Sequence, residues 1–139
     1  MDPTSILYPS IAMALLTLAL LVYMGLTRAG AVRRGEVNPR FYRSYREGEQ
    51  PEALHVLGRH VQNHFEVPPL FHVAVLATYV TGLVDGLAVL LAWSFVGLRI
   101  AHTLVHLGGN RVPRRFAVFA LSVLALAGLW LHLMWGLMS

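Results

Sequence analysis

Residues 6–26 read ILYPSIAMALLTLALLVYMGL, an uncharged run close to the roughly 20 residues that a helix needs to cross a bilayer. Further apolar runs follow at 67–84, 87–107 and 116–138. Asp2 is the only charge before the first run and no small-residue cleavage site follows it, so we expect a retained helix rather than a signal peptide. The predicted fold class is all-α and integral to the membrane, a four-transmembrane-helix bundle.

Turn-forming residues divide the chain between these runs. Asn38-Pro39 and Gln50-Pro51 mark a long polar connection, Asp85-Gly86 a tight hairpin, and Pro113 the end of a third connection. We therefore expect a single membrane domain over 1–139, with helices at about 6–28, 55–84, 86–107 and 114–138 and a cytoplasmic loop over 29–54.

The composition excludes several classes of protein. Hydrophobic residues make up 56% of the 139 residues and charged residues 13%, against about 25% charged in a soluble domain. The absence of cysteine excludes disulfides, thiolate metal sites and a cysteine nucleophile. Any thiol chemistry must therefore use a thiol that a ligand brings.

The 11 basic residues are all arginine, which favours a bacterial source and hence the bacterial inner membrane. They lie mainly in the first and third connections. The positive-inside bias places these two connections in the cytoplasm and both termini on the opposite side. This topology explains the net charge of +4 better than nucleic-acid binding does.

Polar residues interrupt the second helix on one face. Arg59, Asn63 and Glu66 stand at i, i+4 and i+7, so they share a face of a helix. Ionisable residues at membrane depth usually face a protein interior or a wet cavity and are candidates for function. The alternative is a purely structural Arg59–Glu66 ion pair capped by Asn63.

The third helix carries Arg99, His102 and His106 on one face. The two histidines have the spacing of a metal-binding pair, but no HExxH glutamate and no third ligand is evident, so we expect no metal site. His132, near the far end of the fourth helix, is expected at the membrane interface.

Arginines from the first and fourth helices are expected to lie beside these two polar faces. Arg115 opens the fourth helix, and Arg28 or Arg33 follows the first. Arginine clusters bind carboxylates through paired hydrogen bonds, and a helix N-terminus also favours an anion. The pattern therefore predicts a pocket for an anionic ligand that enters from the cytoplasm.

These residues resemble the MAPEG family, the membrane-associated proteins in eicosanoid and glutathione metabolism. The family pattern Arg-x-x-x-Asn-x-x-Glu followed by Pro matches Arg59, Asn63, Glu66 and Pro68. The pattern Arg-x-x-His-Thr, Leu-Gly and Arg-x-Pro-x-Arg, typical of the prostaglandin-synthase branch, matches the third helix and the connection after it. Its residues here are Arg99, His102, Thr103, Leu107, Gly108, Arg111, Pro113 and Arg115.

The resemblance implies a homotrimer that binds glutathione between subunits near the cytoplasmic face. It implies a glutathione-dependent transferase or peroxidase for hydrophobic or lipid electrophiles, with Arg115 as the catalytic residue that stabilises the thiolate. The remaining residues implied in glutathione binding are Arg59, Gln62, Asn63, Glu66, Arg99, His102, His106 and either Arg28 or Arg33.

Four positions depart from the family pattern. His106 replaces a ligand-contacting tyrosine, Gln62 a second arginine, Phe116 a serine, and Val67 a tyrosine of the leukotriene branch. Prostaglandin isomerisation and leukotriene synthesis are therefore poorly supported. Two other functions stay open: a non-catalytic MAPEG-fold protein that binds another anion or lipid, and a small transporter or channel subunit.

Overall fold

The computed structural model describes residues 2–45, 48–109 and 111–139, and within these ranges it contains helices and no strand. Arg46 of the predicted loop lies outside the described residues, as do Glu47 and Asn110. The elements in chain order are η1 (Pro3–Ile6), α1 (Leu7–Arg33), α2 (Phe41–Ser44), α3 (Glu52–Glu66), α4 (Pro68–Val80), α5 (Gly86–Gly108) and α6 (Val112–Met138).

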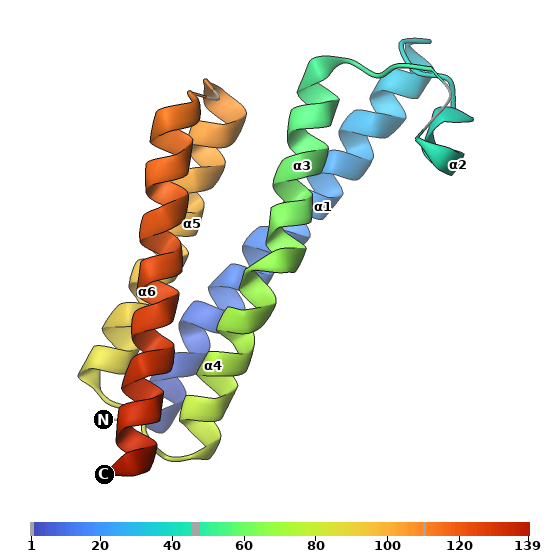
Figure 1. Ribbon diagram of the computed structural model, residues 1–139. Coiled ribbons are helices and arrows are strands. Elements are labelled where there is room, and N and C mark those ends of the chain that lie inside the picture. The colour runs from blue at the N-terminus through green and yellow to red at the C-terminus, as the bar shows by residue number, and fades with distance from the viewer. Residues whose placement is uncertain (1, 46–47, 110) are drawn as a thin grey trace.

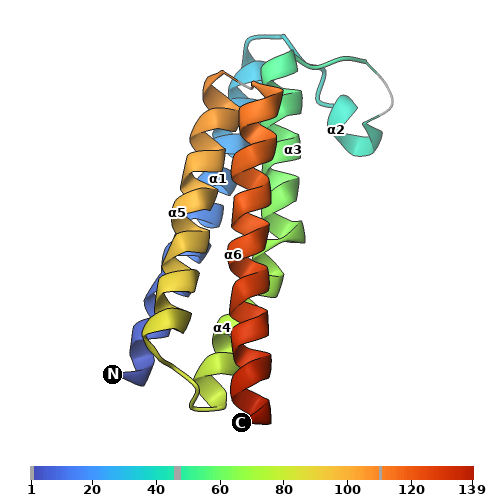
Figure 2. The ribbon, with the colours of Figure 1, turned by 60° about the vertical axis from the view of Figure 1, so that its left-hand side comes forward.

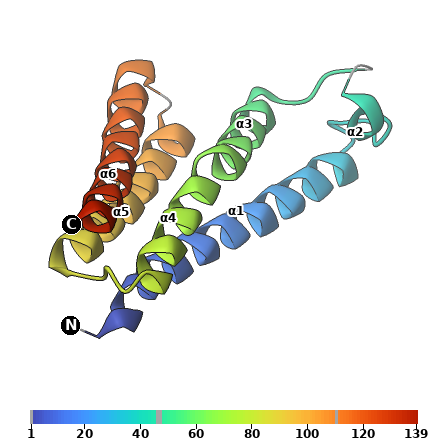
Figure 3. The same cartoon turned by 60° about the horizontal axis from the view of Figure 1, so that its bottom comes forward.

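The helices form two antiparallel groups. α1 runs beside α3 and α4, and α5 packs against α6 (Figure 1). The two groups meet near the chain termini and diverge toward the other end, where the connections α1–α3 and α5–α6 lie (Figures 1 and 3). Figure 2 shows both termini at the same end as the α4–α5 connection. The first and third connections therefore share one end of the molecule.

The first helix runs to Arg33, five residues beyond the predicted end at residue 28, and it terminates at Gly35 rather than at Gly30. Gly35 has φ 75°, a left-handed conformation that glycine adopts without strain. The amides of Gly35 and Glu36 donate to the carbonyls of Val32 and Ala31, the hydrogen bonds of a Schellman motif.

The stretch predicted as one helix at 55–84 is two helices, α3 and α4, that join at Val67. Pro68 and Pro69 have no amide hydrogen to donate to the preceding turn, and a proline ring also clashes with the carbonyl four residues before it. The break separates a polar helix, α3, from an apolar one, α4.

Among the residues that the structure describes, three helical segments are long and apolar enough to cross a membrane: Pro3–Arg33, Gly86–Gly108 and Val112–Met138. Large apolar side chains along them face outward; Leu15 is 61% exposed, Val22 62% and Leu124 65%. Exposed apolar surface of this extent would cause aggregation in water, whereas lipid or another subunit covers it in a bilayer. The chain is an integral membrane protein.

The apolar core lies at the end where the two helix groups meet. Phe71 of α4 stacks on Phe95 of α5 with ring centroids 4.4 Å apart, and both side chains are fully buried. Small residues of α5, Ala88 and Ala92, are buried in the same cluster. Small side chains let neighbouring helices approach closely, which is how helices associate in lipid.

Two side-chain contacts hold α1 against the broken helix. Ser10 Oγ lies 2.7 Å from Nδ1 of His72 on α4, and Thr17 Oγ1 lies 3.1 Å from Nδ1 of His64 on α3. Each contact gives the hydroxyl and one ring nitrogen a hydrogen-bond partner where water is scarce. α1 is thus fixed on both sides of the break.

The hairpin before α5 is held by Asp85. Its carboxylate accepts hydrogen bonds from the Ala88 amide at 2.8 Å and from Nε2 of His132 at 3.0 Å. These bonds, the Ala88 amide first, hold the pKa of Asp85 below its ordinary value. His132, which the sequence placed at the interface, thus connects α6 to the hairpin.

We predict that Asp85→Ala lowers the free energy of unfolding by about 1 kcal/mol, because the first turn of α5 loses its cap. Asp85→Asn should retain most of the stability, since asparagine also caps helices well. Because the pKa is lowered on folding, the carboxylate stabilises the fold above the ordinary aspartate pKa and stops doing so as the pH falls through the folded value. Thermal unfolding of the wild type, Asp85→Ala and Asp85→Asn in detergent across that pH range measures both the loss of the cap and the pH dependence. Equal stability of these three proteins would contradict the prediction.

Candidate functional site

A hollow of about 250 Å³ opens between α3, α5 and α6 on the side of the bundle where the two groups diverge. Three helices supply its walls. Its lining residues are Arg59, Asn63, His102, His106, Val112, Arg115, Phe116 and Phe119. Five of the residues that the sequence predicted for an anion site therefore share this hollow.

Helical spacing explains why these side chains gather. Arg59 and Asn63 are four residues apart on α3, and His102 and His106 are four residues apart on α5, so each pair lies on one face. The amide of Asn63 donates to the carbonyl of Arg59 at 3.2 Å, which fixes the asparagine along its own helix. Arg59 lines the hollow and is also exposed, so this residue stands at its mouth.

The first turn of α6 places a cation at the same hollow. Pro113 stands within the first turn, where its missing amide hydrogen costs nothing. Arg115 follows two residues later and is half-buried against the hollow. Its charge adds to the partial positive charge of the helix N-terminus, and together they favour a negative group in this space.

Arg99 lies behind this wall rather than in it. The side chain is fully buried, and one terminal nitrogen, Nη2, donates to the carbonyl of Asn63 at 3.3 Å. The guanidinium carbon lies 5.9 Å from the centre of the Phe119 ring. Nε and Nη1 have no hydrogen-bond partner among the described residues. A buried cation with unused donors is costly unless a further group, such as an anion, satisfies them.

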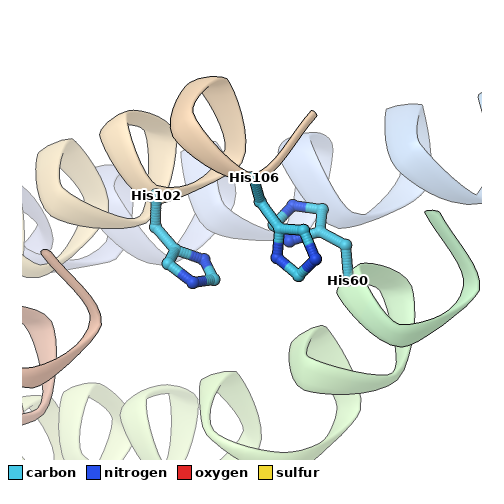
Figure 4. A group of neighbouring side chains, drawn as sticks. All are labelled: His60, His102 and His106. Atoms are coloured by element: carbon cyan, nitrogen blue, oxygen red, sulfur yellow. The ribbon is translucent and has the colours of Figure 1, made fainter. Parts of the chain in front are cut away.

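Four histidines, two on α3 and two on α5, occupy the space between these helices. His60, His64, His102 and His106 are each at most 3% exposed. Figure 4 shows the rings of His60, His102 and His106 directed into the same space. Their ring centroids lie 4.8–5.5 Å apart.

A second hollow lies on the other side of Arg59, between the end of α1, α3 and the α2 region. Arg28 lines it together with Tyr45, Arg59 and Gln62. The Nη1 atom of Arg28 donates to the Tyr45 hydroxyl at 3.2 Å. Arg33, the alternative to Arg28 in the sequence, is exposed and lines neither hollow.

Arg28 reaches α3 because Gly58 leaves room for it. A side-chain carbon at position 58 would lie 3.3 Å from the Nη2 atom of Arg28, closer than most such contacts allow. The guanidinium also lies 5.1 Å from the centre of the Tyr42 ring, within the range of a cation–π contact. The structure thus places Arg28, and not Arg33, beside Arg59.

Glu66 lies apart from both hollows. Its carboxylate accepts a hydrogen bond from the Gln62 amide at 3.1 Å, and both side chains are exposed. Within the described residues no ion pair joins Arg59 to Glu66, so the structural ion pair considered from the sequence does not form in this chain.

Candidate residues that the sequence did not predict include Tyr45 and Phe119, which line the two hollows, and His60, which lies beside His102 and His106. His60 had a visible signal, because it stands four residues before His64 on the predicted helix. Tyr45 lies in the connection between α1 and α3 and has a positive φ. Helical periodicity cannot predict the position of a residue in such a connection. Phe119 is one of many apolar residues in α6, and only its contacts distinguish it.

No curated protein and no solved structure matches this sequence closely enough to support a comparison. The family model that matches is that of the MAPEG family, over residues 6–135. The matched range covers nearly the entire chain, including every residue that lines either hollow. The family includes glutathione transferases and related enzymes as well as non-catalytic members. The chain therefore belongs to the MAPEG family of membrane proteins.

Proposed function

We propose that this protein is a glutathione-dependent transferase or peroxidase acting on hydrophobic or lipid electrophiles. The observation that carries the proposal is the convergence of Arg59, Asn63, His102, His106 and Arg115 on one hollow beside a membrane-facing helix. Glutathione has two carboxylates, an amine and a thiol, and the hollow offers groups suited to its anionic parts. Members of the MAPEG family bind glutathione.

Each arginine has a distinct part in this proposal. Arg59, at the mouth and shared by both hollows, binds a carboxylate of glutathione, and Arg28 binds the same end of the ligand from the second hollow. Arg115 lies deeper and faces the thiol. A guanidinium beside a thiol favours the ionised thiolate, which is the nucleophilic form.

The chemistry needs no residue of the chain to form a covalent bond. In the transferase reaction the thiolate sulfur forms a bond to an electrophilic carbon while the bond from that carbon to its leaving group breaks, and the leaving group takes the thiol proton. In an addition the sulfur instead adds across a double bond, whose π bond breaks, and the other atom of that bond takes the proton. In the peroxidase reaction two glutathione molecules reduce a hydroperoxide to an alcohol and water and become glutathione disulfide. Val112, Phe116 and Phe119 give the hollow an apolar wall, against which a lipid-like substrate would lie beside Arg115.

One chain supplies only part of such a site. The hollow is smaller than the roughly 300–1,000 Å³ of typical ligand pockets. Arg99 and the neighbouring histidines also keep buried nitrogen atoms without a partner among the described residues. Family members form trimers. We therefore propose a homotrimer in which a neighbouring copy closes the hollow around glutathione.

The membrane arrangement follows from the same proposal. α3 and α4 together form a fourth crossing, although neither half is long enough alone. The end that carries the arginine-rich connections faces the cytoplasm of a bacterial cell, so glutathione enters from there. The departures at Gln62, His106 and Phe116 argue against prostaglandin isomerisation, which is not proposed.

We predict that the purified protein in mild detergent ionises glutathione, seen as thiolate absorbance in the ultraviolet, and that Arg115→Ala abolishes this signal. Turnover should fall by about 10²–10³-fold, as when one charge-stabilising donor is removed from an active site. Arg114→Ala is the matched control, since Arg114 is the preceding arginine, is exposed and lines neither hollow. A thiolate signal that survives in Arg115→Ala would refute the role of Arg115. Absence of glutathione binding in the wild type would favour a protein that binds another anion.

We predict that Arg59→Ala and Arg28→Ala each weaken glutathione binding by roughly 10–100-fold, because a hydrogen bond to a charged group contributes about 1.5–3 kcal/mol. Arg33→Ala should change the dissociation constant by less than about twofold, since that side chain is exposed and lines neither hollow. Isothermal titration calorimetry in detergent measures all three. A larger effect of Arg33→Ala than of Arg28→Ala would reverse the assignment.

A further inference from the structure

Three buried imidazoles from two helices form a cluster, and two of them, His102 and His106, also line the hollow of the proposed glutathione site. His60 of α3 and His102 and His106 of α5 each offer a ring nitrogen, and these atoms all lie within 4.8 Å of one another. Figure 4 shows the three rings directed into one space between the helices. From the sequence only His102 and His106 formed a pair, and the missing third ligand argued against a metal. The packing of α3 on α5 supplies that third ligand.

Most ring nitrogens of this cluster lack a hydrogen-bond partner among the described residues. Nδ1 of His60, Nδ1 of His102 and both ring nitrogens of His106 are buried, with no hydrogen-bond partner among the described residues. A buried polar atom without a partner costs about 1–3 kcal/mol. Several such atoms pointing into one space indicate that something else occupies it.

The hydrogen bonds of Thr103 identify the free atom of His60. The Thr103 hydroxyl donates its single hydrogen to the carbonyl of Arg99 at 2.9 Å. It must therefore accept from Nε2 of His60, which lies 2.9 Å away. The proton of His60 is then on Nε2, and Nδ1 presents a lone pair to the cluster. Metal-binding histidines are commonly fixed in this way, with the second nitrogen donating to a neighbouring group.

We propose that His60, His102 and His106 bind a divalent transition-metal ion of the zinc class, with Nδ1 as the ligand atom of His60. Three imidazoles with one open position form the ligand set of many zinc sites, and imidazole also suits cobalt, nickel and copper. Tetrahedral zinc places nitrogens about 3.3 Å apart when each bond is about 2.0–2.1 Å. The ring nitrogens now lie within 4.8 Å of one another. Small side-chain rotations that move these nitrogens about 1–2 Å closer together would bring them to the tetrahedral spacing.

The charges around the cluster determine the fourth ligand. Arg59 and Arg115 line the same hollow as His102 and His106, and Arg99 lies one turn before His102 on α5. These cations weaken the binding of a bare dication and favour an anion beside it. Two of the three proposed ligands face the hollow, so the open position is reached from there. The metal would thus bind together with an anionic ligand such as hydroxide or a carboxylate.

The metal site does not depend on the proposed glutathione activity, and its test contains no glutathione. The full-length protein is purified in detergent with a histidine-free affinity tag, stripped with a chelator, and incubated with zinc or cobalt in a thiol-free buffer. We expect about one metal ion per chain after desalting, measured by mass spectrometry. We also expect the intense visible bands of four-coordinate cobalt.

His60→Gln and His102→Gln should lose stoichiometric metal, because two imidazoles rarely hold zinc without a third protein ligand. His64→Gln is the matched control. It lies one turn from His60 on the same helix, is 2% exposed and contacts a threonine hydroxyl as His60 does. It should retain the metal. Equal loss in His64→Gln and His60→Gln, or no metal in the wild type above that in His60→Gln, would overturn the proposal.

Thr103→Val tests the site without removing a ligand. The substitution keeps the size of the side chain and removes only the hydroxyl that accepts from His60. Loss of such a partner typically weakens metal binding about 10–100-fold, so we expect the stoichiometry to remain while the dissociation constant rises by that factor. An unchanged dissociation constant would overturn the assignment of Nδ1 as the ligand atom of His60.

Discussion

A buried polar layer between α3 and α5, inside an otherwise apolar bundle, constrains the rest of this structure. Arg99 of α5 is fully buried and donates one hydrogen bond to the carbonyl of Asn63, which connects α5 to α3. His60 does the same through Thr103. In the core of a bilayer polar groups have no water to hydrogen-bond with. The two helices must therefore pack with these side chains in the interface between them. Several buried nitrogens in this layer have no partner among the described residues, which is why both proposed ligands are assigned to it.

The break at Val67 separates a segment that packs the apolar core, α4, from one that carries the polar residues, α3. α4, beyond the two prolines, packs Phe71 on Phe95 and anchors the bundle at the end that holds the termini. α3, before them, carries the polar residues and lies where the helix groups diverge. Because proline removes hydrogen bonds from the preceding turn, the direction of α3 is free to follow its own contacts with α1 and α5.

The anion site and the metal site proposed here are chemically compatible. The arginines around the hollow favour a negative ligand, and His102 and His106 face the same space. A divalent ion held by the histidines would add to the positive charge that attracts an anion. The anion is proposed to bind mainly through guanidinium groups and the metal through imidazole nitrogens, and His102 and His106 line the space that both would share.

The sequence by itself determined the helical membrane class, the arginine-rich end and the facing stripes of α3 and α5, because hydropathy and a 3.6-residue period depend only on local order. It could not determine which of the two arginines near the end of α1, Arg28 or Arg33, reaches α3, since that depends on Gly58 leaving room for Arg28. Nor could it bring His60 to His102 and His106, because α3 and α5 are distant in sequence. Only the packing of one helix against another decided these contacts, through side-chain volume and the pairing of buried polar atoms.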